Sequence, residues 1–585
     1  MTSSPTRTEQ SHVELLHRIG VALSAERDRE RLFELILVEA MTLCGADAGT
    51  LYLRTDDDHM QFVIMRTNSL NIALGGTTGR AIELPPIPLH DPLTGLPNRK
   101  NVVTRATLLK RSVHVPDAYN DSTFDFSGTR EFDRRNNYRS TSLFTVPMIN
   151  TEDRIIGVLQ LLNACDSVTG DVVPFSAENR AIVEALASQA AVTLDNQMLL
   201  QAQRNLLESF IRMLASAIDA KSPYTGAHCE RVPVLVQMLS QEVCDTRDGP
   251  MAEFSLDDER WYELKIAAWL HDCGKVVTPT HVMDKATKLE TICDRIDLVR
   301  ARIEIIKRDA EIAWLRDAVA CTDDASLSRA PLETVLADLD AEVAFLERVN
   351  IGAECLRDDD LAHIRQLGER RFLMAGEWCP LLTEDEVQNL SISRGTLTDE
   401  ERLVINGHMV ETIRMLEVLP FPRHLRNVAE YACGHHEKMD GTGYPRGIYA
   451  GDMSVPARIM AIADVFEALT AQDRPYKPGK TLSQAMRIMG FMKRDNHLDP
   501  DLFDIFVRSG VYRRYGERYL PAGQIDEVDE AWLLAIEPKP FDLPPESARM
   551  ARLTSLLPQF RSVPRQTSPA IRRSGGSGGS GGSGD

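Results

Sequence analysis

The chain has 585 residues, of which 43% are hydrophobic and 26% are charged, and its formal net charge is −20. At about 100–200 residues per domain, this length predicts roughly two to four domains with sizeable cores. The acidic balance argues against a nucleic-acid or anionic-membrane surface, because both require a basic face. The acidic net charge does not exclude a small anionic substrate that a few local cations hold.

Cysteines and chain ends indicate the compartment. The ten cysteines are scattered without a CxxC pair, which favours reduced thiols. Residues 1–11 are polar and lack a signal-peptide core, and no apolar run approaches the roughly 18 residues of a membrane span. The Gly-Ser repeat at 574–585 is interpreted as an engineered tail. We therefore expect a cytoplasmic protein that binds neither nucleic acid nor membranes.

Residues 18–196 alternate helix and strand patterns, which predicts an α+β domain. Apolar residues follow helical spacing over 31–44. Short runs rich in branched residues at 49–53, 142–147 and 154–162 predict strands.

The stretch YRSTSLFTVPMINTEDRIIGVLQLLNA, at 138–164, resembles GAF domains, especially those of cyclic nucleotide phosphodiesterases. The resemblance implies a sensor that binds an unidentified small molecule or dimerises. GAF domains that bind cyclic nucleotides carry Asn-Lys, then Phe, then an acidic pair. Here Ala164 replaces the lysine, and Asn179 and Arg180 stand at the acidic positions, so binding of a cyclic nucleotide is not expected.

A second motif inside this domain, HDPLTGLPNR at 90–99, looks like the opening of a diguanylate cyclase domain. No GGDEF signature follows it in the sequence. We therefore interpret it as a loop shaped by proline and glycine.

A long helical pattern runs from about 176 to 219. It contains a heptad seam with spacings of seven, four and three, formed by Leu199, Leu206, Phe210 and Met213. We expect residues 197–219 to form a signalling helix in a homodimer, which couples the sensor domain to the rest of the chain.

Residues 220–515 are predicted to be mostly helical and are followed by a C-terminal extension at 516–573. An unusual stretch at about 288–397 carries two apolar rows that step by four and three. The rows are Ile292, Ile296, Val299, Ile303 and Ile306, and Leu332, Leu336, Leu339, Val343 and Leu346. They predict an inserted antiparallel helical hairpin. The alternative is two ordinary amphipathic helices packed on the core.

The strongest chemical signal is a set of histidines and aspartates in this helical region. Its members are His228, the pair His271-Asp272, His408, the pair His435-His436, and Asp464. Imidazoles mixed with carboxylates suit transition metals such as iron, manganese or zinc. Adjacent residues on a helix point about 100° apart, so each pair can place one ligand on each of two metals. Any one of these histidines alone would more often be an ordinary core residue.

Four segments resemble the HD-GYP branch of the HD phosphohydrolases. They are YTGAHCERV at 224–232, HDCGK at 271–275, HHEKMDGTGYP at 435–445 and RIMAIADVFEALTAQDRPYK at 458–477. The resemblance implies a helical domain that hydrolyses cyclic di-GMP, or in some members cyclic GMP-AMP. It implies two divalent transition metal ions, iron or manganese. The implied ligands are His228, His271, Asp272 and Asp464 for one metal, and His408, His435 and His436 for the other, with Asp272 bridging.

Two metals about 3.5–4 Å apart would activate a water and clamp the phosphate oxygens. We assign Lys275, three residues after the HD pair, to the scissile phosphate or leaving oxygen, with Asp272 as the other catalytic residue. Arg474 and Lys477 are candidates for the second phosphate. Solvated surface charge is the alternative for all three basic residues.

The loop that contains Gly443, Tyr444 and Pro445 is shaped by two glycines and a proline. Tyr444 is a candidate to stack on a guanine, and a purely structural role is the alternative. In the family this loop also contacts partner proteins that contain a GGDEF domain.

The sequence therefore predicts a GAF sensor and an HD-GYP phosphodiesterase with linear pGpG as the main product. The alternatives are a catalytically weak cyclic dinucleotide receptor and an HD enzyme for cyclic GMP-AMP or another nucleotide. Some family members hold a third metal through a glutamate four residues before the first histidine ligand. Tyr224 occupies that position, and a phenol with a pKa near 10 is a poor substitute, so two metals are expected.

Overall fold

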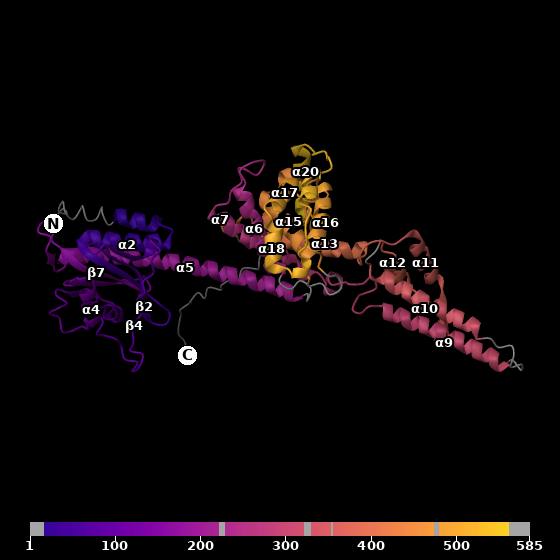
Figure 1. Cartoon of the computed structure of the whole chain (residues 1–585), viewed down its shortest axis with the longest axis horizontal. Helices are drawn as coiled ribbons and strands as arrows, with labels where there is room; N and C mark the ends of the chain where they lie inside the picture. Colours follow the sequence, from indigo (N-terminus) through magenta and orange to yellow (C-terminus); the bar gives the residue numbers. More distant parts are fainter. Residues whose placement is uncertain (1–16, 222–227, 321–328, 353–354, 473–478, 561–585) are drawn as a thin grey trace, which may run out of the picture. The chain divides into compact units, whose positions relative to one another are not determined.

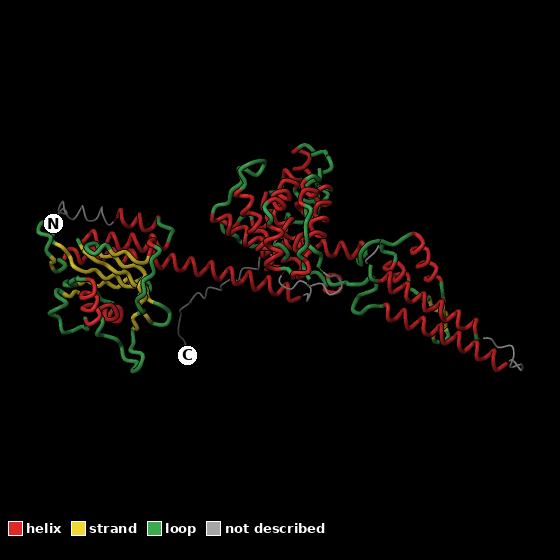
Figure 2. The backbone as a smooth tube through the Cα atoms, in the orientation of Figure 1, coloured by secondary structure: helices red, strands yellow, loops and turns green. Residues whose placement is uncertain are grey.

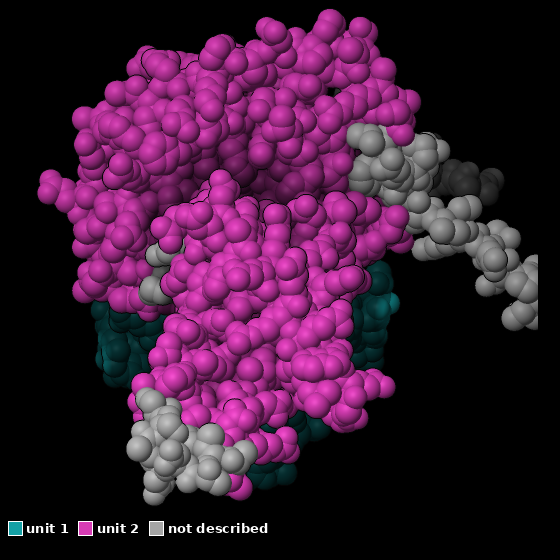
Figure 3. Space-filling model, turned by 90° about the vertical axis from the view of Figure 1, so that its right-hand side faces the viewer, with its two compact units in different colours: residues 1–207 teal, residues 208–585 magenta. Residues whose placement is uncertain are grey.

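The computed structural model describes residues 17–221, 228–320, 329–352, 355–472 and 479–560. The chain divides into two compact units, Met1–Leu207 and Glu208–Asp585, which Figure 3 shows in different colours. The expected order, an α+β domain followed by a helical domain, is confirmed.

An antiparallel sheet forms the centre of the first unit (Figure 2). The strand order is β3-β2-β1-β7-β6-β5, with β4 beside β2 and β8 beside β7. The strands are β1 (Ala46–Arg54), β2 (His59–Thr67), β3 (Ile72–Gly75), β4 (Ile87–Pro88), β5 (Val113–Val115), β6 (Leu143–Ile149), β7 (Ile155–Cys165) and β8 (Val172–Val173). The three strands predicted from the sequence are thus present as β1, β6 and β7.

Helices cover both faces of this sheet, with α2 on one side and α4 on the other (Figure 1). Residues 17–25 are also helical, and the further helices are α2 (Arg29–Cys44), the 3-10 turn η1 (Gly76–Thr78), α3 (Val102–Leu109), α4 (Ser127–Asn136) and α5 (Ala177–Lys221). Strand alternation explains the two layers. Leu51 and Leu53 of β1 pack in the core with α2 and α5, whereas Tyr52 packs with Val103 of α3.

Helix α5 is the long helix predicted from the sequence. Its first half packs in the core of the sheet domain through residues that include Leu186 and Leu194, and its last turns pack in the helical core through Ile211 and Ile218. The four residues of the heptad seam are exposed, at 54% for Leu199, 58% for Leu206, 52% for Phe210 and 57% for Met213.

The second unit has a helical core that surrounds the predicted metal ligands. Its elements are α6 (His228–Asp245), α7 (Asp258–Leu270), η2 (Cys273–Val277), α8 (Thr280–Met283), α13 (Asp399–Val418), η3 (Arg423–Leu425), α14 (Val428–Cys433), η4 (Ala450–Asp452), α15 (Val455–Thr470), α16 (Leu482–Arg494), α17 (Pro500–Arg508), α18 (Val511–Tyr519), η5 (Ala522–Gln524), α19 (Glu530–Leu534) and α20 (Glu546–Phe560).

The predicted insertion contains two long antiparallel helices, α9 (Ile296–Ala320) and α10 (Ala330–Asn350). Ion pairs show that the two helices run antiparallel, because Arg300 near the start of α9 pairs with Glu347 near the end of α10 at 2.5 Å. Further along, Lys307 pairs with Asp340 at 2.5 Å. Most buried members of both predicted rows share one core with residues of the elements that follow them in the sequence.

Two details of the predicted hairpin are wrong. Ile292 is 98% exposed and precedes α9, because the chain turns before Ile296, whose backbone N–H donates to Asp294 at 3.0 Å. The insertion also contains α11 (Asp358–Glu369), the antiparallel ribbon β9 (Arg371–Met374) and β10 (Glu377–Pro380), and α12 (Glu384–Leu390). Ala375 and Gly376 both have positive φ, the backbone that a tight hairpin turn requires.

No helix among the described residues is both long and apolar enough to span a bilayer. The cysteines of the same residues are free thiols.

Candidate metal centre

The His271-Asp272 pair follows the end of α7, whose last residues are buried in the helical core. His271 is fully buried and Asp272 nearly so. The Nδ1–H of His271 donates to the carbonyl of Ala268 at 2.7 Å. This bond fixes the tautomer and leaves Nε2 as the atom available to a ligand.

Gly274 explains how this pair reaches helix α13. A Cβ added at Gly274 would lie 2.0 Å from the carbonyl oxygen of His408 and 2.6 Å from the backbone nitrogen of Thr412. Only glycine therefore permits this approach, which the bond from its N–H to Thr412 Oγ1 at 3.0 Å stabilises. The close packing brings Asp272 beside His408, and their Oδ1 and Nε2 atoms are 3.4 Å apart.

The second histidine pair follows the short helix α14. His435 Nδ1–H donates to the carbonyl of Ala432 at 2.6 Å. Gly434 lets α14 approach α15 closely, since an added Cβ would lie 2.7 Å from Cβ of Ala457. Helix α15 carries Asp464, whose Oδ1 lies 3.4 Å from Nε2 of His228 on α6.

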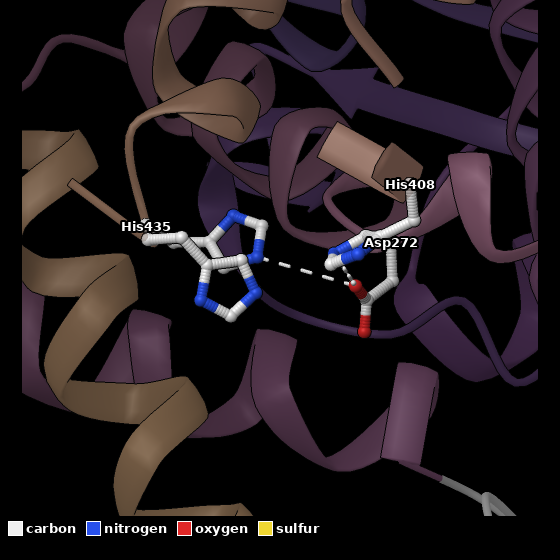
Figure 4. A group of neighbouring side chains, drawn as sticks. Asp272, His408 and His435 are labelled. Carbon is white, nitrogen blue, oxygen red and sulfur yellow. Dashed lines mark ion pairs between the residues drawn. The ribbon is translucent and has the colours of Figure 1, made fainter. Parts of the chain in front are cut away.

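The seven predicted ligands converge in two groups that share Asp272. One group is His228, His271, Asp272 and Asp464, and the other is Asp272, His408, His435 and His436. Oδ2 of Asp272 faces the first group, at 3.3 Å from His228 and 3.2 Å from His271. Its Oδ1 faces the second, with His408 at 3.4 Å and His435 at 4.0 Å (Figure 4). One carboxylate thus presents one oxygen to each group.

The hydrogen bonding of the donor atoms fits bound cations. The Nε2 atoms of His228, His271, His408 and His435 and Oδ1 of Asp272 are buried and have no hydrogen-bond partner in the part of the chain that the structure describes. Buried polar atoms without a partner are costly and rare in native proteins. Five of them gathered in the two groups therefore indicate a centre that bound cations would complete.

Electrostatics favours ionised carboxylates here. Burial raises the pKa of Asp272, but Lys275 and His271 outweigh it and hold the pKa well below its usual range. Burial likewise opposes ionisation of Asp464, and His228 and His435 outweigh it, so that this pKa is also lowered.

Three histidines of the centre have shifted pKa values. Burial lowers the pKa of His435 to about 4 and holds that of His436 well below its usual value, so both are neutral at pH 7. Burial also opposes charge on His228, but Glu467 and Asp272 outweigh it and raise its pKa well above the usual value. A cation bound among the same carboxylates would compete with that proton.

Lys275 lies at the rim of the centre, where its side chain is 25% exposed. Its Nζ donates to Oδ2 of Asp272 at 2.6 Å. Burial opposes its charge, but Asp272 outweighs it and raises the pKa of the ammonium group. The other predicted basic contacts, Arg474 and Lys477, lie outside the described residues, as does Tyr224.

The loop with Gly443 folds back on the second histidine pair. A Cβ on Gly443 would lie 2.4 Å from Cα of Glu437 and 2.4 Å from the nitrogen of Lys438. The buried Glu437 carboxylate accepts from the backbone N–H groups of Arg446 at 2.8 Å and Ile448 at 3.1 Å. Glycine and glutamate together fix the path of the loop.

The same loop places Tyr444 against a predicted ligand. Its ring stacks on His436 with centroids 4.8 Å apart and planes at 16°. The Tyr444–Pro445 peptide bond is cis. The observed contact of Tyr444 is therefore with a predicted metal ligand.

Two charged residues near the ligands were not singled out from the sequence. Glu467 contacts Nδ1 of His228 and accepts from Nε of Arg231 at 2.6 Å. Glu467 stands three residues after Asp464 in the apolar run of α15, and this spacing puts the two carboxylates on one face of the helix. The carboxylate of Glu467 within the otherwise apolar sequence of α15 was the signal by which it could have been found from the sequence.

The sheet domain contains a cavity of about 330 Å³ on the face covered by α3 and α4. Its lining includes the aromatic side chains of Tyr52, Phe62, Phe126, Phe132 and Tyr138. The volume lies in the range of about 300–1,000 Å³ typical of small-molecule sites. Asn163 is structural here, because its amide donates to Tyr138 Oη at 2.9 Å and to the carbonyl of Arg139 at 2.8 Å.

Comparisons with known families match both parts of the chain. A family model described as GAF domain matches residues 28–194, and one described as HD domain matches residues 384–502. His228 and the His271-Asp272 pair precede the second match, on the other side of the insertion.

Curated relatives are similar to this chain over its HD region. A 3'3'-cGAMP-specific phosphodiesterase from Vibrio cholerae is 41% identical over 115 residues, which are 20% of this chain and 26% of the relative. A cyclic di-GMP phosphodiesterase from Pseudomonas aeruginosa is 39% identical over 119 residues, which are 20% of this chain and 28% of the relative. One from Thermotoga maritima is 34% identical over 125 residues, 20% of this chain and 33% of the relative. The chain thus spans about a quarter to a third of the length of these relatives.

Proposed function

We propose that this chain, which joins a GAF domain to an HD domain, is a metal-dependent phosphodiesterase that hydrolyses a cyclic dinucleotide such as cyclic di-GMP or cyclic GMP-AMP. The observation that carries the proposal is the pair of ligand groups that share Asp272. The names of the relatives, at 34–41% identity over the helical unit, supply the substrate class.

The donor set supports two divalent transition metals, with iron or manganese as our proposal. One group offers two imidazoles and two carboxylates, and the other offers three imidazoles and the shared carboxylate. Mixed nitrogen and oxygen donors of this kind suit iron, manganese and zinc. When bound, such a pair supplies an activated water and neutralises the charge that builds on a phosphodiester during attack.

The chain's own residues would orient the substrate. Asp272 holds the two groups together because each of its oxygens faces a different one. The partly exposed ammonium group of Lys275 is our candidate for the scissile phosphate. Tyr444 is fixed on His436, so the Gly443–Pro445 loop would shape the wall of the site beside the second group. We propose a linear dinucleotide as the main product.

Regulation by the GAF domain is part of the proposal. The cavity of about 330 Å³ is our candidate site for an unidentified small molecule. The exposed seam of α5 is our candidate for contact with a second copy, because its four apolar residues follow heptad spacing. Leu206→Glu would place a charge on that seam and should shift a dimer towards monomer in analytical ultracentrifugation. A partner that contains a GGDEF domain is a further candidate, at the loop that includes Tyr444.

A turnover assay tests the proposal. Protein purified anaerobically and loaded with Fe²⁺ or Mn²⁺ is incubated with cyclic di-GMP and, separately, with 3'3'-cGAMP, and Asp272→Ala serves as the inactive control. We expect one or both to be converted to a linear dinucleotide by the wild-type protein alone. Binding of either compound without hydrolysis, at full metal content, would instead indicate a receptor.

A further inference from the structure

His228 differs from His271, His408 and His435 in the group that holds its second nitrogen. Nδ1 of His271, His408 and His435 meets a backbone carbonyl in each case. Nδ1 of His228 meets the carboxylate of Glu467 instead. The two ligand groups are therefore supported unequally.

The position and burial of Glu467 hold its carboxylate against His228. It lies on α15 three residues after Asp464, and its side chain is only 2% exposed. Its other oxygen accepts from Nε of Arg231 at 2.6 Å, and Arg231 lies on α6 three residues after His228. Each of the two helices thus contributes one ligand and, one turn later, one member of the supporting ion pair.

The ion pair between Glu467 and Arg231 acts on the ligand group that contains His228. A carboxylate that accepts from Nδ1–H fixes the tautomer and orientation of the imidazole and makes its Nε2 a stronger donor than a neutral carbonyl does. Arg231 offsets the cost of burying the Glu467 charge. His228 belongs only to the group with His271, Asp272 and Asp464.

We propose that Glu467 is a positioning residue that selectively raises the metal affinity of the His228, His271, Asp272 and Asp464 site. The inference rests on the proposed two-metal centre and concerns metal binding, so it does not depend on the identity of the substrate. It also makes the two sites unequal in the wild-type protein, with the site supported by Glu467 the tighter one.

Titration of the metal-free full chain with Mn²⁺ tests this, with calorimetry for affinities and electron paramagnetic resonance for pairing of the ions. Glu467→Gln removes the charge at nearly constant size. Glu467→Asp keeps the charge, but its shorter side chain moves the carboxylate away from Nδ1 of His228. We expect each variant to weaken one of the two sites about 10–100-fold and leave the other unchanged. At two equivalents of Mn²⁺, the variants should show isolated ions where the wild type shows a coupled pair.

Glu263→Gln is the matched control, because Glu263 is also 2% exposed in the same unit but accepts from Asn427. It should lower stability without changing either Mn²⁺ affinity. Equal weakening of both sites by the Glu467 variants, or unchanged affinities, would overturn the inference while leaving the metal centre in place. A wild-type protein that binds no pair of Mn²⁺ ions would refute the metal centre itself.

Discussion

Gly274→Ala probes how the fold assembles the metal centre. The added Cβ would lie 2.0 Å from the carbonyl oxygen of His408, about 1.4 Å inside the 3.4 Å at which ordinary contact begins. The atoms it meets are mostly backbone of α13, so η2 and the helix must move apart. Overpacking of this kind costs about 1–3 kcal/mol, and loss of the bond to Thr412 adds about 1 kcal/mol. We expect the free energy of unfolding to fall by about 2–4 kcal/mol.

The same movement would separate Asp272 from His408, which are 3.4 Å apart in the wild type. Urea unfolding and Mn²⁺ titration of the metal-free protein should therefore show lower stability together with weaker binding at the second site. Gly407→Ala is the matched control, because Gly407 neighbours His408 on α13 and an added Cβ meets nothing within 4 Å. That change should be neutral or stabilising, since alanine favours a helix. A Gly274→Ala protein as stable as the wild type would refute the packing argument.

Three further outcomes are expected. Asp272→Ala should reduce bound metal at both sites and lower turnover by orders of magnitude, and substantial activity at full metal content would contradict the bridging role. Excision of 288–397 as one unit should preserve Mn²⁺ binding, whereas removal of α9 and α10 alone should cause aggregation, because α11 and α12 share their core. Burial lowers the pKa of His497 to about 4, so the unfolded chain binds its proton first, near pH 6.5. The free energy of unfolding should therefore fall between pH 6.5 and 4, and less so in His497→Gln; equal slopes would contradict this.

Periodic features of the fold were predictable from the sequence. The long helix α5 and the two rows of the insertion follow from apolar spacing, because a helix repeats every 3.6 residues whatever its neighbours. The exposed seam from Leu199 to Met213 also agrees with that spacing. Local turns were less predictable. Ile292 fits the heptad count but precedes the helix, and the ribbon β9–β10 depends on a two-residue turn at Ala375 and Gly376.

Some residues of the candidate site were likewise predictable from the sequence, and others were not. The paired residues His271-Asp272 and His435-His436 stand out because adjacent metal-ligand residue types are distinctive in a sequence. The supporting residues are harder to find, because their role depends on which helices pack together. Glu467 meets His228 across 239 positions of the chain, and only the contact of α6 with α15 brings them together.

Hydrolysis of cyclic di-GMP by metal-free protein reconstituted with zero to three equivalents of Mn²⁺ tests the central claim most directly. Two groups that share Asp272 predict that activity rises with the second equivalent, stops rising beyond two and yields a linear dinucleotide. Full activity without metal, or a requirement for a third equivalent with rapid release of GMP, would contradict the two-metal account.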